Sequence, residues 1–399
     1  MDDFTFNPFD PDTRRDPAPV YARARRERPV HRHAGLPIVS IFRYDDIQSV
    51  LRDAETWSSQ FPPPPGVDAA RMPPRSMLGQ DPPSHTRLRS LVSQAFTPRI
   101  VRRLEPRMHA VAAELMTAAV ARGEVDFVAA MTYPLPVVVI AEIIGVPIED
   151  RDQFKHWSDI AVAGLGSGLF APPDMARLQQ LEGILREMGT YFSRLADDRR
   201  GAPREDLLTG LVQAEVEGSK LSHAEMITML VLLLVAGNET TTTLIGNAVV
   251  ELLAHPAELA RLRADPALLP SAIDEVLRFS SPVQLDPRRA TRRVELRGEV
   301  IEAGQIVVSW LGSANRDEAV FADGERFDIA RVDNRHLAFG FGPHFCLGAN
   351  LARLEAQAAL GALLAATREF ALASAAPLPL HPSLVFKGVT ELPLRLTPS

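Results

Sequence analysis

The residue with the clearest chemical potential is Cys346, the only cysteine among the 399 residues. It lies in the segment Phe339-Gly-Phe-Gly-Pro-His-Phe-Cys-Leu-Gly348. A cysteine acts as a metal ligand when it is a thiolate, which needs nearby hydrogen-bond donors or positive charge. Gly342 permits a tight turn whose backbone N–H groups face the sulfur, and a helix starting just after Cys346 directs its positive dipole end toward it. The segment therefore favours a ligating thiolate over a buried structural cysteine, the usual fate of a lone cysteine.

This segment resembles the cysteine loop of the cytochrome P450 superfamily, Phe-x-x-Gly-x-His/Arg-x-Cys-x-Gly, at every fixed position. The resemblance, to the soluble bacterial type, implies that Cys346 ligates the iron of haem b. A thiolate ligand there donates electron density and favours O–O cleavage. It also implies that Phe339 forms an apolar wall beside the sulfur and that Gly348 lets the next helix lie close to the macrocycle.

A second segment, Ala236-Gly-Asn-Glu-Thr-Thr241, lies midway along a long helical pattern. It is similar to the family's oxygen-activation segment, which implies that Glu239 and Thr240 form an acid–alcohol pair that delivers protons and that Ala236 contacts haem. Gly237 is expected to permit a local bulge. The bland alternative is that Thr240–Thr243 only hydrogen-bond back to their own helix, but four β-branched residues in a row suit a helix interior poorly.

Four further residues match the family's contacts to the haem propionates. His85 and Arg89 are spaced i, i+4 on one helix face, and His344 lies two residues before the cysteine. Arg288 is the fourth, favoured over Arg289 by its spacing to Thr291. Two carboxylates in a dry pocket require such paired donors.

Glu275 and Arg278 are spaced i, i+3, a pattern that by itself usually marks a surface pair. In this context they resemble the family's structural triad, with Arg331 as the third member. The implied role is to lock the irregular segment that leads into the cysteine loop, not catalysis.

The resemblance also implies a substrate pocket above the haem, walled in part by the segments Phe61–Met77 and Ala161–Leu178. The single residues expected to contact substrate are Leu232, Val235, Ala236, Val283, Gln284, Val385 and Phe386. Most are apolar, which predicts a lipophilic small molecule, with Gln284 as an anchor for one polar group. Polyketides, terpenoids, steroids and fatty acids all remain open.

The chain carries no flavin domain and no cysteine-rich iron–sulfur segment, so electrons are expected from a separate ferredoxin and its reductase, and oxygen from O2. Candidate docking cations are Arg99, Arg102, Arg103 and Arg353. A net charge of −7 without basic blocks argues against a nucleic-acid partner. The longest apolar run, Met226–Ala236, is too short to span a bilayer, and the N-terminal residues do not resemble a signal peptide, so we expect a cytoplasmic protein without membrane contact.

The elements that must position these residues are mainly helical. Apolar periodicity predicts helices over Tyr44–Asp53, Arg99–Arg122, Leu178–Asp198 and His223–Leu253, and one from Cys346 to about Leu364. Strands are expected at Leu36–Phe42, Arg293–Leu296 and Gln305–Trp310, with a hairpin over Leu384–Leu396. We predict a single domain over 1–399, β-rich over about 1–80 and helical over about 81–399. The fold class is mainly α with small β-sheets (α+β), and the resemblance implies a triangular prism with haem between the long central helix and the cysteine-loop helix.

The leading hypothesis is monooxygenation, by hydroxylation or epoxidation. One alternative is a peroxygenase or an oxygen-independent haem-thiolate enzyme, which would have little use for the acid–alcohol pair. The other is a non-catalytic haem-binding or lipid-binding protein, which would need neither that pair nor the cysteine loop.

Overall fold

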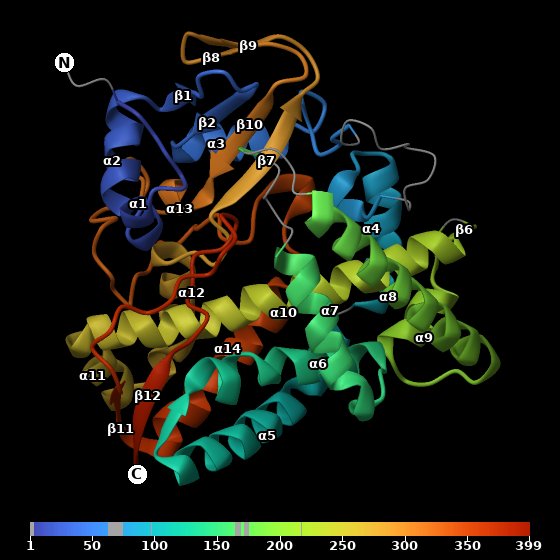
Figure 1. Ribbon diagram of the computed structural model, residues 1–399, viewed down its shortest axis with the longest axis vertical. Helices are drawn as coiled ribbons and strands as arrows, with labels where there is room; N and C mark the ends of the chain where they lie inside the picture. Colours follow the sequence, from blue (N-terminus) through green and yellow to red (C-terminus); the bar gives the residue numbers. More distant parts are fainter. Residues whose placement is uncertain (1–3, 63–74, 97, 164–168, 171–174, 217) are drawn as a thin grey trace.

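The structure is a computed structural model that describes residues 4–62, 75–96, 98–163, 169–170, 175–216 and 218–399. Helices make up most of it, with one sheet at the top of Figure 1 and another at the bottom, near the C-terminus. The mainly α architecture with small sheets that the sequence predicts is therefore confirmed.

The α-helices follow the predicted periodicity closely. They are α1 (Pro11–Arg15), α2 (Ala18–Glu27), α3 (Tyr44–Arg52), α4 (Ser84–Ala95), α5 (Pro98–Arg122), α6 (Pro134–Ile144), α7 (Arg151–Ala163), α8 (Met175–Gly201), α9 (Leu207–Gln213), α10 (His223–Ala254), α11 (Pro256–Ala264), α12 (Leu269–Phe279), α13 (Leu311–Ala314) and α14 (Ala349–Ala366). Short 3₁₀ or π turns join them: η2 (Met77–Gly79), η3 (Val128–Thr132), η4 (Ile148–Asp150), η5 (Pro266–Leu268) and η6 (Gly342–His344).

The strands form two main sheets and two small hairpins. They are β1 (Val30–Arg32), β2 (Ile38–Ile41), β3 (Trp57–Ser58), β4 (Glu124–Asp126), β5 (Glu215–Val216), β6 (Ser219–Lys220), β7 (Leu285–Ala290), β8 (Val294–Leu296), β9 (Glu299–Ile301), β10 (Ile306–Trp310), β11 (Thr367–Leu372) and β12 (Pro393–Pro398). The five-stranded sheet has the order β1-β2-β10-β7-β3, with β10 and β2 parallel and the other pairs antiparallel.

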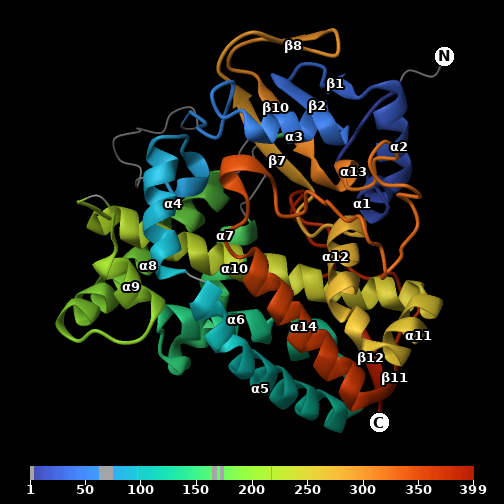
Figure 2. The same ribbon diagram turned by 180° about the vertical axis from the view of Figure 1, so that it is seen from behind.

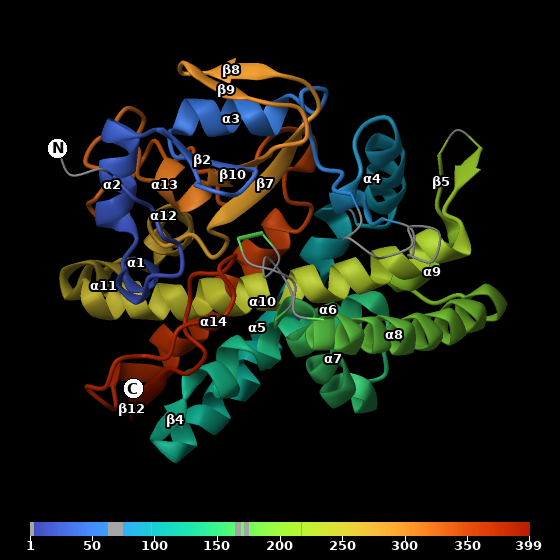
Figure 3. The same cartoon turned by 45° about the horizontal axis from the view of Figure 1, so that its top comes forward.

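The first 80 residues do not form a β-rich unit of their own. Their strands β1, β2 and β3 share the five-stranded sheet with β7 and β10, which come more than 200 residues later in the chain. Figure 3 shows α3 running alongside this sheet, and its apolar residues Ile47, Val50 and Leu51 join the same core as the strands. The N-terminal strands and the later strands therefore share one sheet and one core, and the single domain over 1–399 stays a prediction.

The C-terminal tail differs from the predicted hairpin over Leu384–Leu396. β12 pairs instead with β11, and β4 adds to its other edge. Residues 380–389 form a loop closed by a single bridge between Leu380 and Val389, and a second bridge joins Phe386 to Val283. The local sequence pattern does not reveal that β12 pairs with β11, a strand more than 20 residues earlier in the chain.

The central helix α10 crosses the middle of the molecule; α14 packs against it, and α5 packs against α14 on the side seen in Figure 2. A capping box fixes its start, because Ser222 and Glu225 satisfy each other's backbone N–H groups. It is long and apolar enough to cross a membrane, the only such helix among the described residues, but 56% of its most apolar window is buried inside the protein. We interpret α10 as the core helix.

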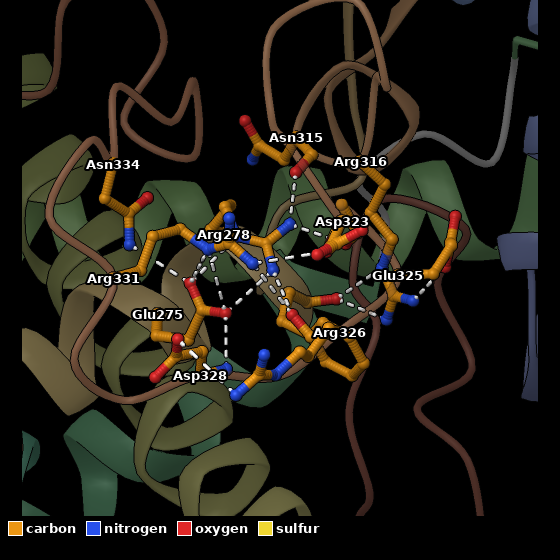
Figure 4. A network of polar contacts seen from close by, with 12 residues as sticks. Glu275, Arg278, Asn315, Arg316, Asp323, Glu325, Arg326, Asp328, Arg331 and Asn334 are labelled. Atoms are coloured by element: carbon orange, nitrogen blue, oxygen red, sulfur yellow. Dashed lines mark hydrogen bonds and ion pairs between the residues drawn. The ribbon is translucent and has the colours of Figure 1, made fainter.

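A buried charge cluster fixes the irregular segment between α13 and the cysteine loop (Figure 4). Glu275 and Arg278, both 0% exposed, form a bidentate ion pair with two hydrogen bonds. Arg331 contributes a second guanidinium, 3.1 Å from the Glu275 carboxylate. The remaining donors of Arg278 reach the carbonyls of Asn315, Gly324 and Arg326. The predicted triad is thus assembled, and it joins α12 to the backbone of the segment at several points between Asn315 and Asp328.

Candidate functional site

A cavity of about 340 Å³ lies between α10 and the loop that precedes α14. Its wall brings together residues from segments far apart in the chain. Those that the sequence singled out are His85, Arg89, Leu232, Ala236, Gly237, Thr240, Val283, Phe339, His344, Cys346 and Gly348. Most of the exposed surface in this cavity is apolar.

Cys346 lies on the cavity wall at the base of α14, where η6 turns the chain into the helix. Its backbone N–H donates to the Phe339 carbonyl at 2.9 Å, so a hydrogen bond closes the loop between these two residues. Gly342 has φ +70°, and a Cβ there would lie 2.6 Å from the Leu51 carbonyl oxygen. Only glycine therefore lets the cysteine loop sit against the end of α3.

The electrostatic surroundings of the sulfur act in two directions. Burial raises the pKa of the Cys346 thiol, while the Gly348 N–H and the charges of Arg89 and Arg353 oppose that rise. Arg353 lies over the Phe339 ring, 4.6 Å from its centroid. A cation bound directly to the sulfur is the strongest stabiliser of a thiolate, and it would overcome the cost of burial.

A cluster of nitrogen donors borders the cavity, and we call it the cationic rim after its two arginines. His85, Arg89 and His344 line the cavity, and Arg288 of β7 lies near both histidines. The His85 and His344 rings lie 4.2 Å apart. His85 is 2% exposed, and neither ring nitrogen has a hydrogen-bond partner among the described residues. Burial and the neighbouring arginines hold the pKa of both histidines low, to about 3 for His344.

Within this rim the structure distinguishes Arg288 from Arg289. Arg288 is 5% exposed and lies close enough to both histidines to depress their pKa values, while it also pairs with Asp286. Arg289 instead donates to the Gln60 carbonyl at the edge of the sheet. Alternation along β7 turns the two side chains to opposite faces.

The residues present fit haem. A buried imidazole without partners, beside two arginines and a second histidine, is a costly arrangement unless an anion joins it. The two propionates of haem are such anions. Gly348 bears no side chain, and a Cβ built there lies 4.0 Å from the Cys346 sulfur, so the start of α14 leaves the sulfur open to the cavity.

The oxygen-activation segment lies on α10 opposite the cysteine. Ala236, Gly237 and Thr240 face the cavity, and the Thr240 hydroxyl donates to the Ala236 carbonyl at 2.8 Å. The expected bulge at Gly237 is absent, because α10 is continuous from His223 to Ala254. The back-bonded threonine occupies the Ala236 carbonyl without breaking the helix.

Glu239 does not line the cavity; its carboxylate points toward the 380–389 loop. There its Oε1 lies 3.1 Å from Nε2 of His381, and both side chains are largely buried. Sequence reasoning missed His381, because the loop that carries it is more than 140 positions away and no spacing rule connects the two.

The predicted substrate contacts divide into two groups. Leu232, Ala236 and Val283 line the cavity, whereas Val235 packs against the main core and Val385 against the core beneath α2. Phe386 lines a separate small cavity. The segments Phe61–Met77 and Ala161–Leu178 lie in large part outside the described residues, although Met77 itself reaches the cavity wall.

Gln284 requires a correction, because it does not reach the cavity as a polar anchor. Its Nε2 donates to the Ser281 carbonyl at 2.7 Å, and its Oε1 accepts from Tyr21 at 3.2 Å. Both ends of the amide are therefore occupied inside the protein, next to Gly312.

The sequence also gave no sign of Glu355, a buried carboxyl on α14 that lines the cavity. Burial raises its pKa to about 8, with the Thr241 hydroxyl acting in the opposite direction. A single glutamate in a helical sequence pattern is usually a surface residue, and only the packing of α10 against α14 shows otherwise.

Of the four candidate docking cations, two are engaged within the protein. Arg353 pairs with Asp274 at 2.7 Å, and Arg103 pairs with Glu205 at 3.0 Å on the surface. Arg102 is exposed on α5, and the side chain of Arg99 lies outside the described residues.

Comparison with known proteins points the same way as the geometry. The family model described as Cytochrome P450 matches residues 175–373. Cytochrome P450 monooxygenase PikC of Streptomyces venezuelae is 41% identical over 95% of this chain and 91% of its own length. The structure of cytochrome P450 CYP109Q5 from Chondromyces apiculatus matches 99% of this chain and 98% of its own with a TM-score of 0.90 and 40% identity. CYP109E1 from Bacillus megaterium, solved in complex with testosterone, matches 96% of this chain and 99% of its own with a TM-score of 0.85 and 38% identity.

Proposed function

The chain belongs to the cytochrome P450 superfamily, and we propose that it inserts one oxygen atom from O2 into a lipophilic small molecule. Membership makes it a haem b oxidoreductase of the P450 type. The observation that carries the proposal is the meeting of Cys346, Thr240 and the cationic rim around one cavity.

Two sets of residues would bind haem, one through its iron and one through its propionates. Cys346 would supply the iron ligand, and His85, Arg89, Arg288 and His344 would bind the propionates. When bound, haem supplies the redox chemistry that activates oxygen. The apolar side chains of the cavity exclude bulk water from that chemistry.

Residues of α10 would deliver the protons that the reaction consumes. Thr240 places a hydroxyl on the cavity wall, and Glu239 is the adjacent carboxyl on the same helix. A proton held on the Glu239 carboxyl passes to the Thr240 hydroxyl oxygen, and the hydroxyl's own proton moves on into the cavity. The presence of both an acid and an alcohol on α10 favours monooxygenation over peroxide-driven chemistry, which needs no such proton supply.

The cavity supports a lipophilic substrate. Leu232, Leu233, Leu244 and Val283 contribute apolar surface to its wall. Because CYP109E1 was solved with testosterone, that steroid is a reasonable first probe for this chain.

We expect electrons from a ferredoxin and its reductase in a cytoplasmic setting. Arg102 and Arg103 lie on α5, and Arg103 pairs only with an exposed glutamate, which a partner can displace. Changing Arg102→Glu with Arg103→Glu should slow reduction by an acidic ferredoxin at low salt. Stopped-flow measurement of the reduction rate checks this, and an unchanged rate would remove these residues from the docking surface.

Thr240→Ala tests the proposed reaction. With testosterone as the probe and a surrogate ferredoxin and reductase, we expect hydrogen peroxide to replace most of the hydroxylated product while NADPH consumption continues. Thr242→Ala is the matched control, since the Thr242 hydroxyl is buried without a partner among the described residues and lies outside the cavity wall. An unchanged product-to-NADPH ratio in Thr240→Ala would contradict the proposal.

A further inference from the structure

The carboxylate of Glu239 contacts a histidine on the 380–389 loop. The Nε2 of His381 lies 3.1 Å from Oε1 of Glu239, and the side chains are 8% and 14% exposed. The Nδ1 of the same ring accepts the Ser383 backbone N–H at 3.1 Å. A backbone amide keeps its proton, so this bond leaves Nε2 as the position that carries hydrogen and donates to Glu239.

The loop that carries His381 is held rigidly against α10. The His381 N–H donates to the Gly388 carbonyl at 2.9 Å, and Arg14 donates to the His381 carbonyl. The edge of the Phe386 ring meets the imidazole, with 5.1 Å between centroids. At Gly388 a Cβ would lie 2.6 Å from the Thr243 side chain, so the glycine is what allows the loop to approach α10 one turn beyond Glu239.

A second small cavity of about 40 Å³ lies on the loop side of His381. Its lining includes Arg14, Thr13, Tyr21 and Lys387, which are polar, and it has room for about one water molecule. His381 therefore lines this recess and also contacts the Glu239 carboxyl on α10, while Thr240, the next residue on that helix, lines the main cavity.

We infer that His381 is a positioning residue for proton delivery: its Nε2–H holds the Glu239 carboxylate in one orientation, turned toward the 380–389 loop. This inference rests on the proposed function, and it concerns a residue outside the cysteine loop and the cavity wall. His381 exchanges no proton in this role, because its other nitrogen is occupied by the Ser383 amide. Its contribution is to fix one orientation of Glu239.

A double-mutant cycle measures whether His381 acts through Glu239. His381→Leu should raise the peroxide-to-product ratio roughly three- to tenfold with testosterone as the probe, and the same change in a Glu239→Gln background should add little. His381→Gln should keep at least half of the wild-type coupling, because the glutamine amide can donate from nearly the same position. His255→Gln, which disrupts another histidine–glutamate pair at the end of α10, is the control. Equal effects of His381→Leu in both backgrounds would overturn the inference.

A direct observation of the contact needs no turnover. In protein labelled with ¹⁵N-histidine, the His381 resonance, assigned by its loss in His381→Gln, should show hydrogen at Nε2. Glu239→Gln should shift that signal. A His381 signal that does not respond to Glu239→Gln, or one with hydrogen only at Nδ1, would overturn the inference.

The two failures are distinguishable. If the NMR contact is present and wild-type protein reduces oxygen without oxidising any probe, the proposed function fails and the pair stands as a structural contact. If wild-type protein hydroxylates testosterone and Thr240→Ala uncouples it, but the His381 variants behave like wild type, only the role of His381 fails.

Discussion

Two buried polar clusters in this molecule differ in whether the protein itself satisfies their hydrogen bonds. Around Glu275, the carboxylate accepts from Arg278 and Arg331 and from the Asp328 amide, and Arg278 is satisfied by backbone carbonyls (Figure 4). In the cationic rim, His85 is as deeply buried yet has no partner for either ring nitrogen among the described residues.

The difference separates structure from function. A cluster whose charges are closed by the protein itself stabilises the fold and has no capacity left for a ligand. A buried donor without a hydrogen-bond partner raises the free energy of the protein, and an anionic ligand that accepts from it removes that penalty. Substitutions in the first should therefore act on the protein alone, and substitutions in the second should act on haem binding.

Glu275→Gln should have the largest effect on the fold. It leaves Arg278 buried opposite a neutral amide, and breaking such a pair costs about 3–5 kcal/mol of unfolding free energy. Denaturant unfolding of the haem-free protein measures this, with the exposed Glu391→Gln as control. If haem-free Glu275→Gln were as stable as the control, the cluster would not be what fixes the segment before the cysteine loop.

His85→Leu should act in the opposite sense. Removing an imidazole with two unsatisfied nitrogens leaves the haem-free protein as stable as wild type or more stable by about 1 kcal/mol. The rate of haem loss to a scavenging apoprotein should rise roughly tenfold, because a propionate donor is gone. Destabilised apoprotein with unchanged haem retention would show that the rim is closed after all, as the Glu275 cluster is.

Glu355 sharpens the comparison, since it is a buried carboxyl with no opposite charge. Burial raises its pKa from 4.5 to about 8. Between these values the folded protein keeps a proton that the unfolded chain releases, so the stability from this group is complete below pH 4.5. It declines by about 1.4 kcal/mol per unit as pH rises toward 8. The effect is a slope: Glu355→Gln should gain stability relative to wild type between pH 5 and pH 8, and parallel curves would contradict the neutral state of Glu355.

The sequence revealed those parts of the site whose chemistry is local. The cysteine loop, the Ala236–Thr241 segment and the i, i+3 pair Glu275–Arg278 each carry their spacing within a few residues, and the structure places them around one cavity or beneath it. Long helices such as α10 were equally visible, because their periodicity is local too.

What the sequence did not reveal depends on contacts between distant segments. His381 meets Glu239, β12 meets β11, and Gln284 turns toward Tyr21 instead of the cavity, all through packing that no local pattern records. Glu355 is hidden for the same reason, since only the contact between two helices buries it. Local spacing thus predicted the kind of chemistry, whereas tertiary contacts decide which neighbours tune it.

The central claim is that Cys346 ligates haem iron as a thiolate, and the reduced carbon monoxide difference spectrum tests it most directly. Purified protein is reduced with dithionite, exposed to carbon monoxide and compared with Cys346→His as the reference for nitrogen ligation. The account predicts a strongly red-shifted Soret band for the wild-type protein that is lost in Cys346→His. A wild-type band like that of the histidine variant, or no haem band at all, would contradict it.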